Sequence, residues 1–124
     1  MKNITLFQKV STVDKVFFFQ NIEIMIRAGF PLADALRIIG EQTKNKKFKE
    51  IIEQLKNFIE GGGMFSKGLK KYPRVFPEIL ANMVAAGEIS GKLEKTLDQI
   101  TLQLKRSHAL HNKIRNALTY PVII

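Results

Sequence analysis

Apolar residues near the end of the chain recur at alternating steps of four and three. They fall at Leu93, Leu97, Ile100, Leu104, Ile114 and Leu118, and Ser107 and His111 occupy the two positions between. This spacing predicts one long amphipathic helix. From Leu93 to Tyr120 it would extend for about 40 Å at 1.5 Å per residue, which is more than a small domain needs to cover its core. We therefore expect this helix to project beyond the rest of the protein.

The far end of the helix has the features of a segment that approaches a bilayer. Lys105, Arg106, Lys113 and Arg115 precede Tyr120, Pro121 and a short apolar tail, and no acidic residue follows Asp98. A basic collar, an interfacial tyrosine and an apolar run are typical of a helix that enters a membrane from the cytoplasm. A span needs about 20 apolar residues, so residues 120–124 are expected to be only its start. We expect residues 1–12 to be a flexible arm and residues 13–119 to be a helical cytoplasmic domain.

Shorter stripes at helical spacing precede this helix. A helix over residues 13–28 would be apolar over most of its circumference, with a narrow polar stripe at Gln20, Glu23 and Arg27. This is typical of a helix at the centre of a bundle, with an oligomer contact as the alternative. Further helices are expected over residues 32–40, 45–59, 65–71 and 77–86. No stretch alternates with a period of two. The sequence predicts an all-α fold, a compact bundle of about six antiparallel helices whose last helix leads into a membrane span.

Glycine, proline and polar residues mark the ends of these helices. We expect Gly29 to be a left-handed C-cap, and Pro31 and Pro77 to occupy the first helical position. Gly61, Gly62 and Gly63 end the third helix. Ser90 is expected to be the N-cap of the last helix. Glu88 is expected to accept hydrogen bonds from backbone N–H groups at the start of that same helix.

The net charge of +9 indicates an acidic or polyanionic partner surface. Its excess lies in the collar and in a lysine patch: Lys44, Lys46, Lys47, Lys49, Lys67, Lys70, Lys71 and Arg74. No aromatic residues interleave with these lysines in the manner of nucleic-acid binders, so a positive bias beside a membrane is favoured over nucleic acid. There is no cysteine, which excludes disulfides and thiolate metal sites.

The sequence offers little reactive chemistry. His108 and His111 share a helical face, but their basic neighbours disfavour a metal ion there. No nucleophile, base and acid fall in a catalytic arrangement. We predict no catalytic residue, metal site or cofactor, and therefore no enzyme activity.

Several motifs resemble one known family. Residues 83–93, MVAAGEISGKL, contain Gly87, Glu88, Ser90, Gly91 and Leu93 and are similar to the AGE-x-SG-x-L signature of the platform proteins of type II secretion and type IV pilus assembly, the GspF and PilC family. The corner formed by Gly29, Pro31 and Leu32, the Phe76-Pro77 restart and the Tyr120-Pro121 pair resemble further motifs of that family, in the same order.

The resemblance implies a cytoplasmic helical domain that the family carries twice, with the first copy present in this chain. It implies a role at the inner membrane, where the protein couples an assembly ATPase to the polymerisation of pilins or pseudopilins, beside other inner-membrane assembly proteins. The chain departs from the family at Met64, where a serine is usual, and at Gly68, where an alanine is usual. Both changes should weaken the helix over residues 65–71, through a lost cap and the backbone entropy of glycine.

Two further expectations concern partners. Leu110, Ile114 and Leu118 lie beyond the expected bundle, so we predict that they form a weak homodimer contact. The alternative to a platform protein is a basic helical adaptor that binds anionic lipid or nucleic acid and whose terminal helix does not continue into a membrane.

Overall fold

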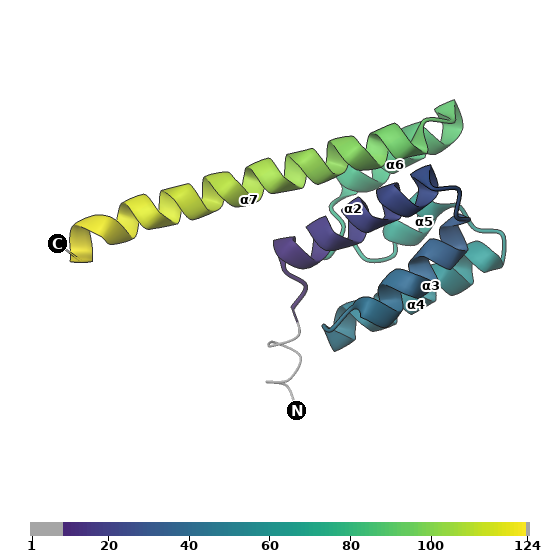
Figure 1. Cartoon of the computed structure of the whole chain (residues 1–124), viewed down its shortest axis with the longest axis horizontal. Coiled ribbons are helices and arrows are strands. Elements are labelled where there is room, and N and C mark those ends of the chain that lie inside the picture. The colour runs from purple at the N-terminus through teal and green to yellow at the C-terminus, as the bar shows by residue number, and fades with distance from the viewer. Residues whose placement is uncertain (1–8, 124) are drawn as a thin grey trace.

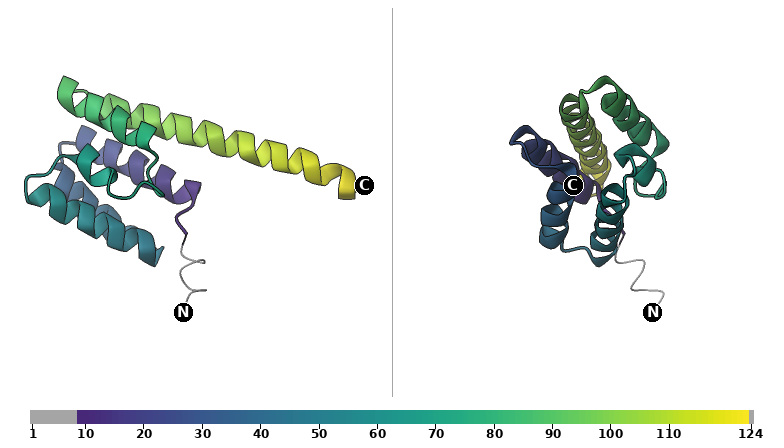
Figure 2. Two further views of the ribbon diagram at one scale, coloured as in Figure 1. Left: turned by 180° about the vertical axis from the view of Figure 1, so that it is seen from behind. Right: turned by 90° about the vertical axis from the view of Figure 1, so that its right-hand side faces the viewer.

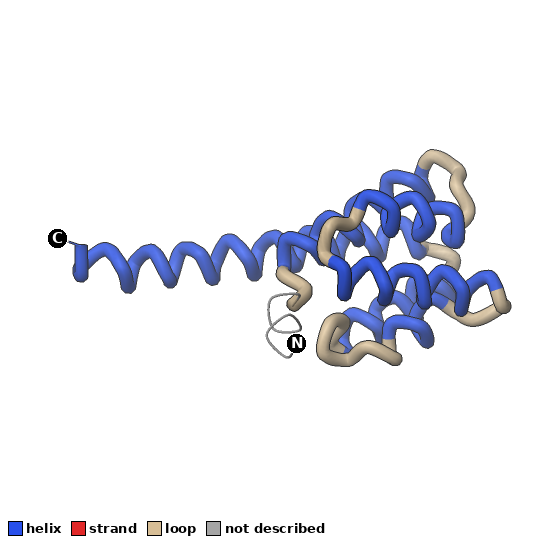
Figure 3. Tube along the Cα trace, turned by 90° about the horizontal axis from the view of Figure 1, so that it is seen from below, coloured by secondary structure: helices blue, strands red, loops and turns tan. Residues whose placement is uncertain are grey.

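The computed structural model describes the backbone of residues 9–123, and the side chains of these residues except at position 111 and positions 115–123. Within this range the chain forms six helices: α2 (Thr12–Arg27), α3 (Leu32–Gln42), α4 (Lys46–Glu60), α5 (Phe65–Leu69), α6 (Glu78–Ser90) and α7 (Leu93–Ile123). Figure 3 shows only helices and loops over the described residues. The all-α prediction is confirmed. The expected arm lies mostly in residues 1–8, outside the described range.

The six helices form a closed ring around one core. Each helix packs against the helix before it and the helix after it, and α7 closes the ring by packing along α2. The end-on view in Figure 2 shows this arrangement. Successive helices reverse direction, so the connections alternate between the two ends of the ring (Figure 1), as the short connections predicted.

Phenylalanine side chains fill the centre of the ring. The Phe18 ring centroid lies 5.0 Å from that of Phe19, 5.2 Å from Phe48, 6.3 Å from Phe65 and 5.6 Å from Phe76. All five side chains are fully buried. These centroid separations lie within the range in which aromatic rings attract one another. The cluster therefore joins α2, α4, α5 and the segment before α6.

The surroundings of α2 differ from the prediction of a central helix. Phe18, Phe19 and Ile22 face the core. Val13, Phe17 and Ile24 point outward and are 59%, 39% and 43% exposed, because a helix in the wall of a ring keeps one face open to solvent.

The expected polar stripe of α2 is also only partly correct. Glu23 is buried, and its carboxylate lies 2.9 Å from the guanidinium of the exposed Arg27. A buried carboxylate is stable when it is paired, so the ion pair explains how the outer edge of the core tolerates this acid.

The last helix, α7, has 31 residues and belongs to the ring over its first half only. Leu97, Ile100 and Thr101 are buried, and Leu104 packs half-buried against the core. Beyond these residues α7 projects away from the bundle, as expected (Figure 1). No helix in the described part of the chain is both long enough and apolar enough to cross a membrane.

Two predicted helix starts are one residue early. Pro31 and Pro77 are N-caps, and α3 and α6 begin at Leu32 and Glu78. Both prolines have the φ of a helix but an extended ψ, 149° and 152°, so each turns the chain before the helix begins. Asn45 is the N-cap of α4, because its side chain accepts a hydrogen bond from the Phe48 N–H at 3.0 Å.

Candidate functional site

Most of the motif residues gather at one end of the ring. The α2–α3, α4–α5 and α6–α7 connections meet there, at the end opposite to the projecting part of α7 (Figure 1). We call this end the motif end, and it carries Gly29, Pro31, Leu32, Gly87, Glu88, Ser90, Gly91 and Leu93. The remaining motif residues lie elsewhere: Phe76 is in the core, Pro77 begins α6, and Tyr120 and Pro121 lie in the projecting part of α7.

Glu88 connects two elements of the motif end. Its carboxylate oxygens accept hydrogen bonds from the backbone N–H groups of Phe65, at 2.8 Å, and Ser66, at 3.1 Å. These are the first two N–H groups of α5, which no residue inside the helix can satisfy. The negative charge of a carboxylate also favours the positive end of the helix. Glu88 is therefore the N-terminal cap of α5, supplied from α6.

This contact corrects one prediction. Glu88 caps α5 and not α7, since the two helices start at the same end of the ring and the sequence does not distinguish them. The expected loss of a local cap at Met64 is confirmed, because Met64 occupies the N-cap position without a side-chain hydrogen bond. Glu88 supplies the missing acceptor from another helix.

The role of Ser90 also differs from the prediction. Ser90 is the last residue of α6, and its hydroxyl donates to the Gly87 carbonyl at 3.3 Å. It is therefore not the N-cap of α7, which begins at Leu93. Gly91 has a φ of 73°, and the Lys92 N–H donates to the Gly87 carbonyl at 2.8 Å. Gly91 thus ends α6 in the left-handed conformation that glycine tolerates.

The Gly29 prediction is confirmed. Gly29 has a φ of 98°. Its N–H donates to the Ile26 carbonyl at 2.9 Å, and the Phe30 N–H donates to the Met25 carbonyl at 3.0 Å. This pair of bonds is the Schellman ending of a helix, so Gly29 sets the corner between α2 and α3.

Gly87 allows α6 and α7 to approach closely. A Cβ atom at this position would lie 2.5 Å from Thr96 Oγ1 and 2.9 Å from Thr96 Cβ, and 3.4 Å from Leu93 Cα. Since Gly87 lies inside α6 and has no positive φ, its requirement is space. The contact fixes how the first turn of α7 sits against the last turns of α6.

The linker between α5 and α6 is attached to α4 through side chains. The Lys71 ammonium lies 3.9 Å from the centroid of the Phe58 ring, and the Tyr72 hydroxyl donates to the Gln54 side chain. Burial raises the pKa of Tyr72, which keeps the phenol protonated as a donor. These contacts hold the linker in one place.

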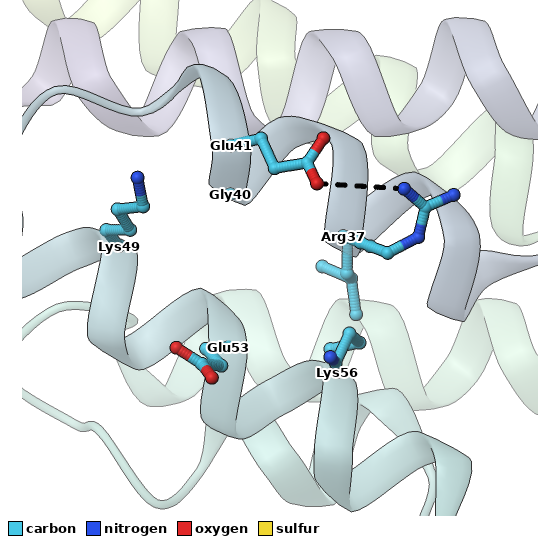
Figure 4. Close-up of a pocket in the computed structure, with 7 residues that line it drawn as sticks. Arg37, Gly40, Glu41, Lys49, Glu53 and Lys56 are labelled. Carbon is cyan, nitrogen blue, oxygen red and sulfur yellow. Dashed lines mark ion pairs between the residues drawn. The ribbon is translucent and has the colours of Figure 1, made fainter.

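A shallow hollow of about 300 Å³ lies between α3 and α4, over Leu36 and Gly40. Charged side chains of both signs surround it: Arg37, Glu41, Lys49, Glu53 and Lys56 (Figure 4). Arg37 and Glu41 form an ion pair at 3.8 Å across one side. Ligand sites are mostly apolar with a few directed polar groups, and this rim has the opposite character. We assign it no ligand.

The projecting part of α7 exposes apolar side chains. Leu110 is 59% exposed and Ile114 is 51% exposed, while the Leu118 side chain lies outside the described ones. His108 Nε2 lies 3.2 Å from the Asn112 side-chain nitrogen. Among the described residues, no three histidine, aspartate or glutamate side chains are placed to hold a metal ion together.

Comparison with known proteins identifies a family that matches this chain. Residues 18–124 match the family described as type II secretion system (T2SS), protein F. The type IV pilus assembly protein PilC of Thermus thermophilus is 41% identical over 111 residues, which are 90% of this chain and 27% of that protein. PilC of Pseudomonas aeruginosa is 34% identical over 117 residues, 94% of this chain and 31% of that protein.

The type II secretion system protein F of Xanthomonas campestris is 36% identical over 109 residues, 88% of this chain and 27% of that protein. The chain thus spans between 27% and 31% of the length of these three relatives. Relatives named for both machines match nearly the whole of this chain.

The Glu88 cap predicts a non-additive pair of substitutions. Glu88→Ala should destabilise the protein by about 1–3 kcal/mol, because two partly buried N–H groups lose their acceptor. Met64→Ser would introduce a local N-cap, so it should stabilise the Glu88→Ala variant more than it stabilises the wild type. Urea denaturation of the four proteins measures this coupling. Equal effects of Met64→Ser in both backgrounds would contradict the cap.

The close contact at Gly87 predicts that Gly87→Val destabilises the fold by about 1–3 kcal/mol, the range of overpacking substitutions. The matched control is Gly61→Val, since a Cβ at Gly61 would meet nothing nearer than 3.5 Å and its φ of −80° suits any residue. Thermal denaturation compares them. Gly87→Ala should also lower the stability, and adding Thr96→Ala to it should recover part of that stability. An unchanged melting temperature of Gly87→Val would refute the contact.

Proposed function

Because this chain belongs to the type II secretion system protein F family, we propose that it forms the first cytoplasmic domain of an inner-membrane platform protein. The platform would couple an assembly ATPase to the polymerisation of pilins or pseudopilins, in type IV pilus biogenesis or type II secretion. The family match over residues 18–124 carries the proposal. Relatives named for each of the two machines support it equally and leave the choice of machine open.

In this proposal, α7 is the mechanical connection between the domain and the membrane. Its first half is fixed along α2 and α6, and Leu97 and Ile100 lie in the core. A continuous helix of 31 residues transmits a displacement of the bundle to its far end. The domain comprises residues 13–119, and residues 120–124 begin the first membrane helix.

The motif residues have architectural roles in this proposal. Glu88 caps α5, Gly87 provides space for α7, and Gly29 and Gly91 end helices. None of these roles needs chemical reactivity, which fits a non-enzymatic coupling protein. These residues therefore do not mark the surface that meets the ATPase or the other assembly proteins.

The alternative of a basic adaptor without a membrane anchor has no support among the names of the relatives. One observation separates the two proposals. If the reading frame continues past Ile124 into a hydrophobic segment of about 20 residues, the protein is anchored in the membrane and the adaptor proposal fails.

The proposal predicts that the full-length protein captures the assembly ATPase and the pilins from a detergent extract of its own cells. Deletion of residues 1–119 should abolish capture of the ATPase and leave the membrane-embedded part able to retain pilins. Affinity purification followed by mass spectrometry measures both. Undiminished capture of the ATPase by the deletion variant would show that this domain is not the contact.

We also propose that the isolated chain forms a weak homodimer through Leu110, Ile114 and Leu118. The like-charged collar opposes this contact, so the dimer should tighten as salt screens the repulsion. Leu110→Ser with Ile114→Ser should abolish it. Ile79→Ser with Ile89→Ser is the control, because these side chains are 60% and 82% exposed on the bundle. Sedimentation at several concentrations measures the dimer. A dimer that still forms in the Leu110→Ser, Ile114→Ser variant would exclude α7 as the interface.

A further inference from the structure

The reversal of direction at each helix end sorts charged residues between the two ends of the ring. The start of α2, the α3–α4 turn and the α5–α6 linker lie together at the end from which α7 projects (Figures 1 and 2). The Asn45 side chain joins two of these segments, because its amide donates to the Lys9 carbonyl at 3.1 Å. We call this end the basic end.

The basic end collects lysines from segments that are distant in the sequence. Lys9 and Lys15 come from the region around the start of α2, and Lys44, Lys46, Lys47 and Lys49 come from the α3–α4 turn and the start of α4. The α5–α6 linker adds Lys70 and Arg74, whereas the ammonium of Lys71 lies over Phe58, near the other end of α4. The acidic residues at the basic end are Glu41, in the last turn of α3, and Asp14, Glu50 and Glu78. The end as a whole is strongly positive.

The opposite end has a different balance. Its helix termini and turns carry Asp34, Glu60, Glu88 and Glu94 against Arg27, Lys67, Lys71, Lys92 and Lys95, which leaves charges of both signs nearly balanced. The net charge of +9 is therefore concentrated at the basic end and on the part of α7 that leaves it, which carries Lys105, Arg106 and Lys113.

The stability of the fold does not explain the lysines at the starts of α2 and α4. The helices α2, α3, α6 and α7 each have an acidic residue in the first turn, which suits the positive end of a helix. The first turn of α4 has none and begins with Lys46 and Lys47, whose charge opposes the helix dipole. At the start of α2, burial and then the neighbouring charge of Lys9 lower the pKa of Lys15. The basic end therefore keeps its charge at some expense of stability.

We propose that the basic end docks on the anionic lipid headgroups of the membrane that α7 approaches. The inference rests on the proposed function for the position of that membrane. Because α7 leaves the ring from this end, a membrane that holds the end of α7 also faces the basic end. A lipid surface suits charges spread over several loops, whereas single-stranded nucleic acid is usually held by a groove with aromatic platforms.

The length of α7 sets the geometry of docking. From Lys105 to Tyr120 the helix rises about 22 Å, well beyond the screening length of about 8 Å in physiological salt. An upright α7 would keep the basic end out of reach of the headgroups. The domain must therefore lean, so that the α3–α4 turn, which lies to one side of the α7 axis (Figure 1), approaches the surface. Pro121 lacks the N–H that would bond to the Ala117 carbonyl, which permits a bend at that point.

The test measures sedimentation of the chain with vesicles of equal parts phosphatidylglycerol and phosphatidylcholine, and with pure phosphatidylcholine vesicles as the neutral comparison. The variant is Lys46→Gln with Lys47→Gln. The matched control is Lys92→Gln with Lys95→Gln, which changes the net charge equally at the opposite end. All four lysines are exposed.

We expect the Lys46→Gln, Lys47→Gln variant to bind the anionic vesicles roughly tenfold to thirtyfold more weakly than the wild type, from about fivefold or slightly less for each surface lysine. The control should change by less than about threefold, because its lysines lie beyond the screening length. The melting temperature of the variant should equal or exceed that of the wild type, since the removed charges oppose the α4 dipole. This excludes unfolding as the cause of weaker binding.

Three results would overturn the docking proposal: equal losses in the variant and the control, equal binding to neutral vesicles, or tighter binding to a single-stranded oligonucleotide than to anionic vesicles. The proposed function is tested separately, by the reading frame beyond Ile124 and by capture of the ATPase. A protein that captures the ATPase while both variants bind lipid equally would retain the platform role and lose only the docking surface.

Discussion

The contacts of the Phe18 ring are the interaction on which the rest of the structure depends. Phe18 touches aromatic rings from its own helix, from α4, from α5 and from the segment before α6. Aromatic pairs of this kind add roughly 0.5–1.5 kcal/mol each beyond their buried area. More important is their placement, because a ring of six helices has no central helix to pack against. The phenylalanine cluster fills the space that a central helix would occupy, and each surrounding helix orients its apolar face toward it.

The two ends of this ring are built under different constraints. At the motif end, Glu88 satisfies the N–H groups of α5, and Gly87 lets α7 lie against α6. A change at either residue leaves a donor without a partner or creates an overlap. At the basic end, the exposed lysines Lys44, Lys46 and Lys47 carry no such packing constraint. The residues of the family signature at the motif end therefore maintain the fold, and the lysines at the basic end are free of that role.

The long helix α7 has one half that is constrained by packing and one half that is not. Its first half completes the core through Leu97 and Ile100, and its second half presents Leu110 and Ile114 to solvent. A helix that is half core and half free surface cannot shift its register without disturbing the bundle. The position of the bundle and the position of the far end of α7 are thus linked, as the proposed coupling role would require.

The sequence by itself determined the helices, the extent of α7 and the all-α class, because these depend on apolar spacing of three and four residues and on turn residues such as Gly29 and Gly91. These signals are local. It also identified the basic segments and the family motifs. The tertiary structure alone decided that Glu88 caps α5, that Glu23 is buried and that Val13, Phe17 and Ile24 face solvent. It also decided that lysines from three separate segments share one end of the ring. Periodicity shows which face of a helix is apolar, but the choice of neighbouring helix depends on how the chain closes on its core, and no local pattern encodes that closure.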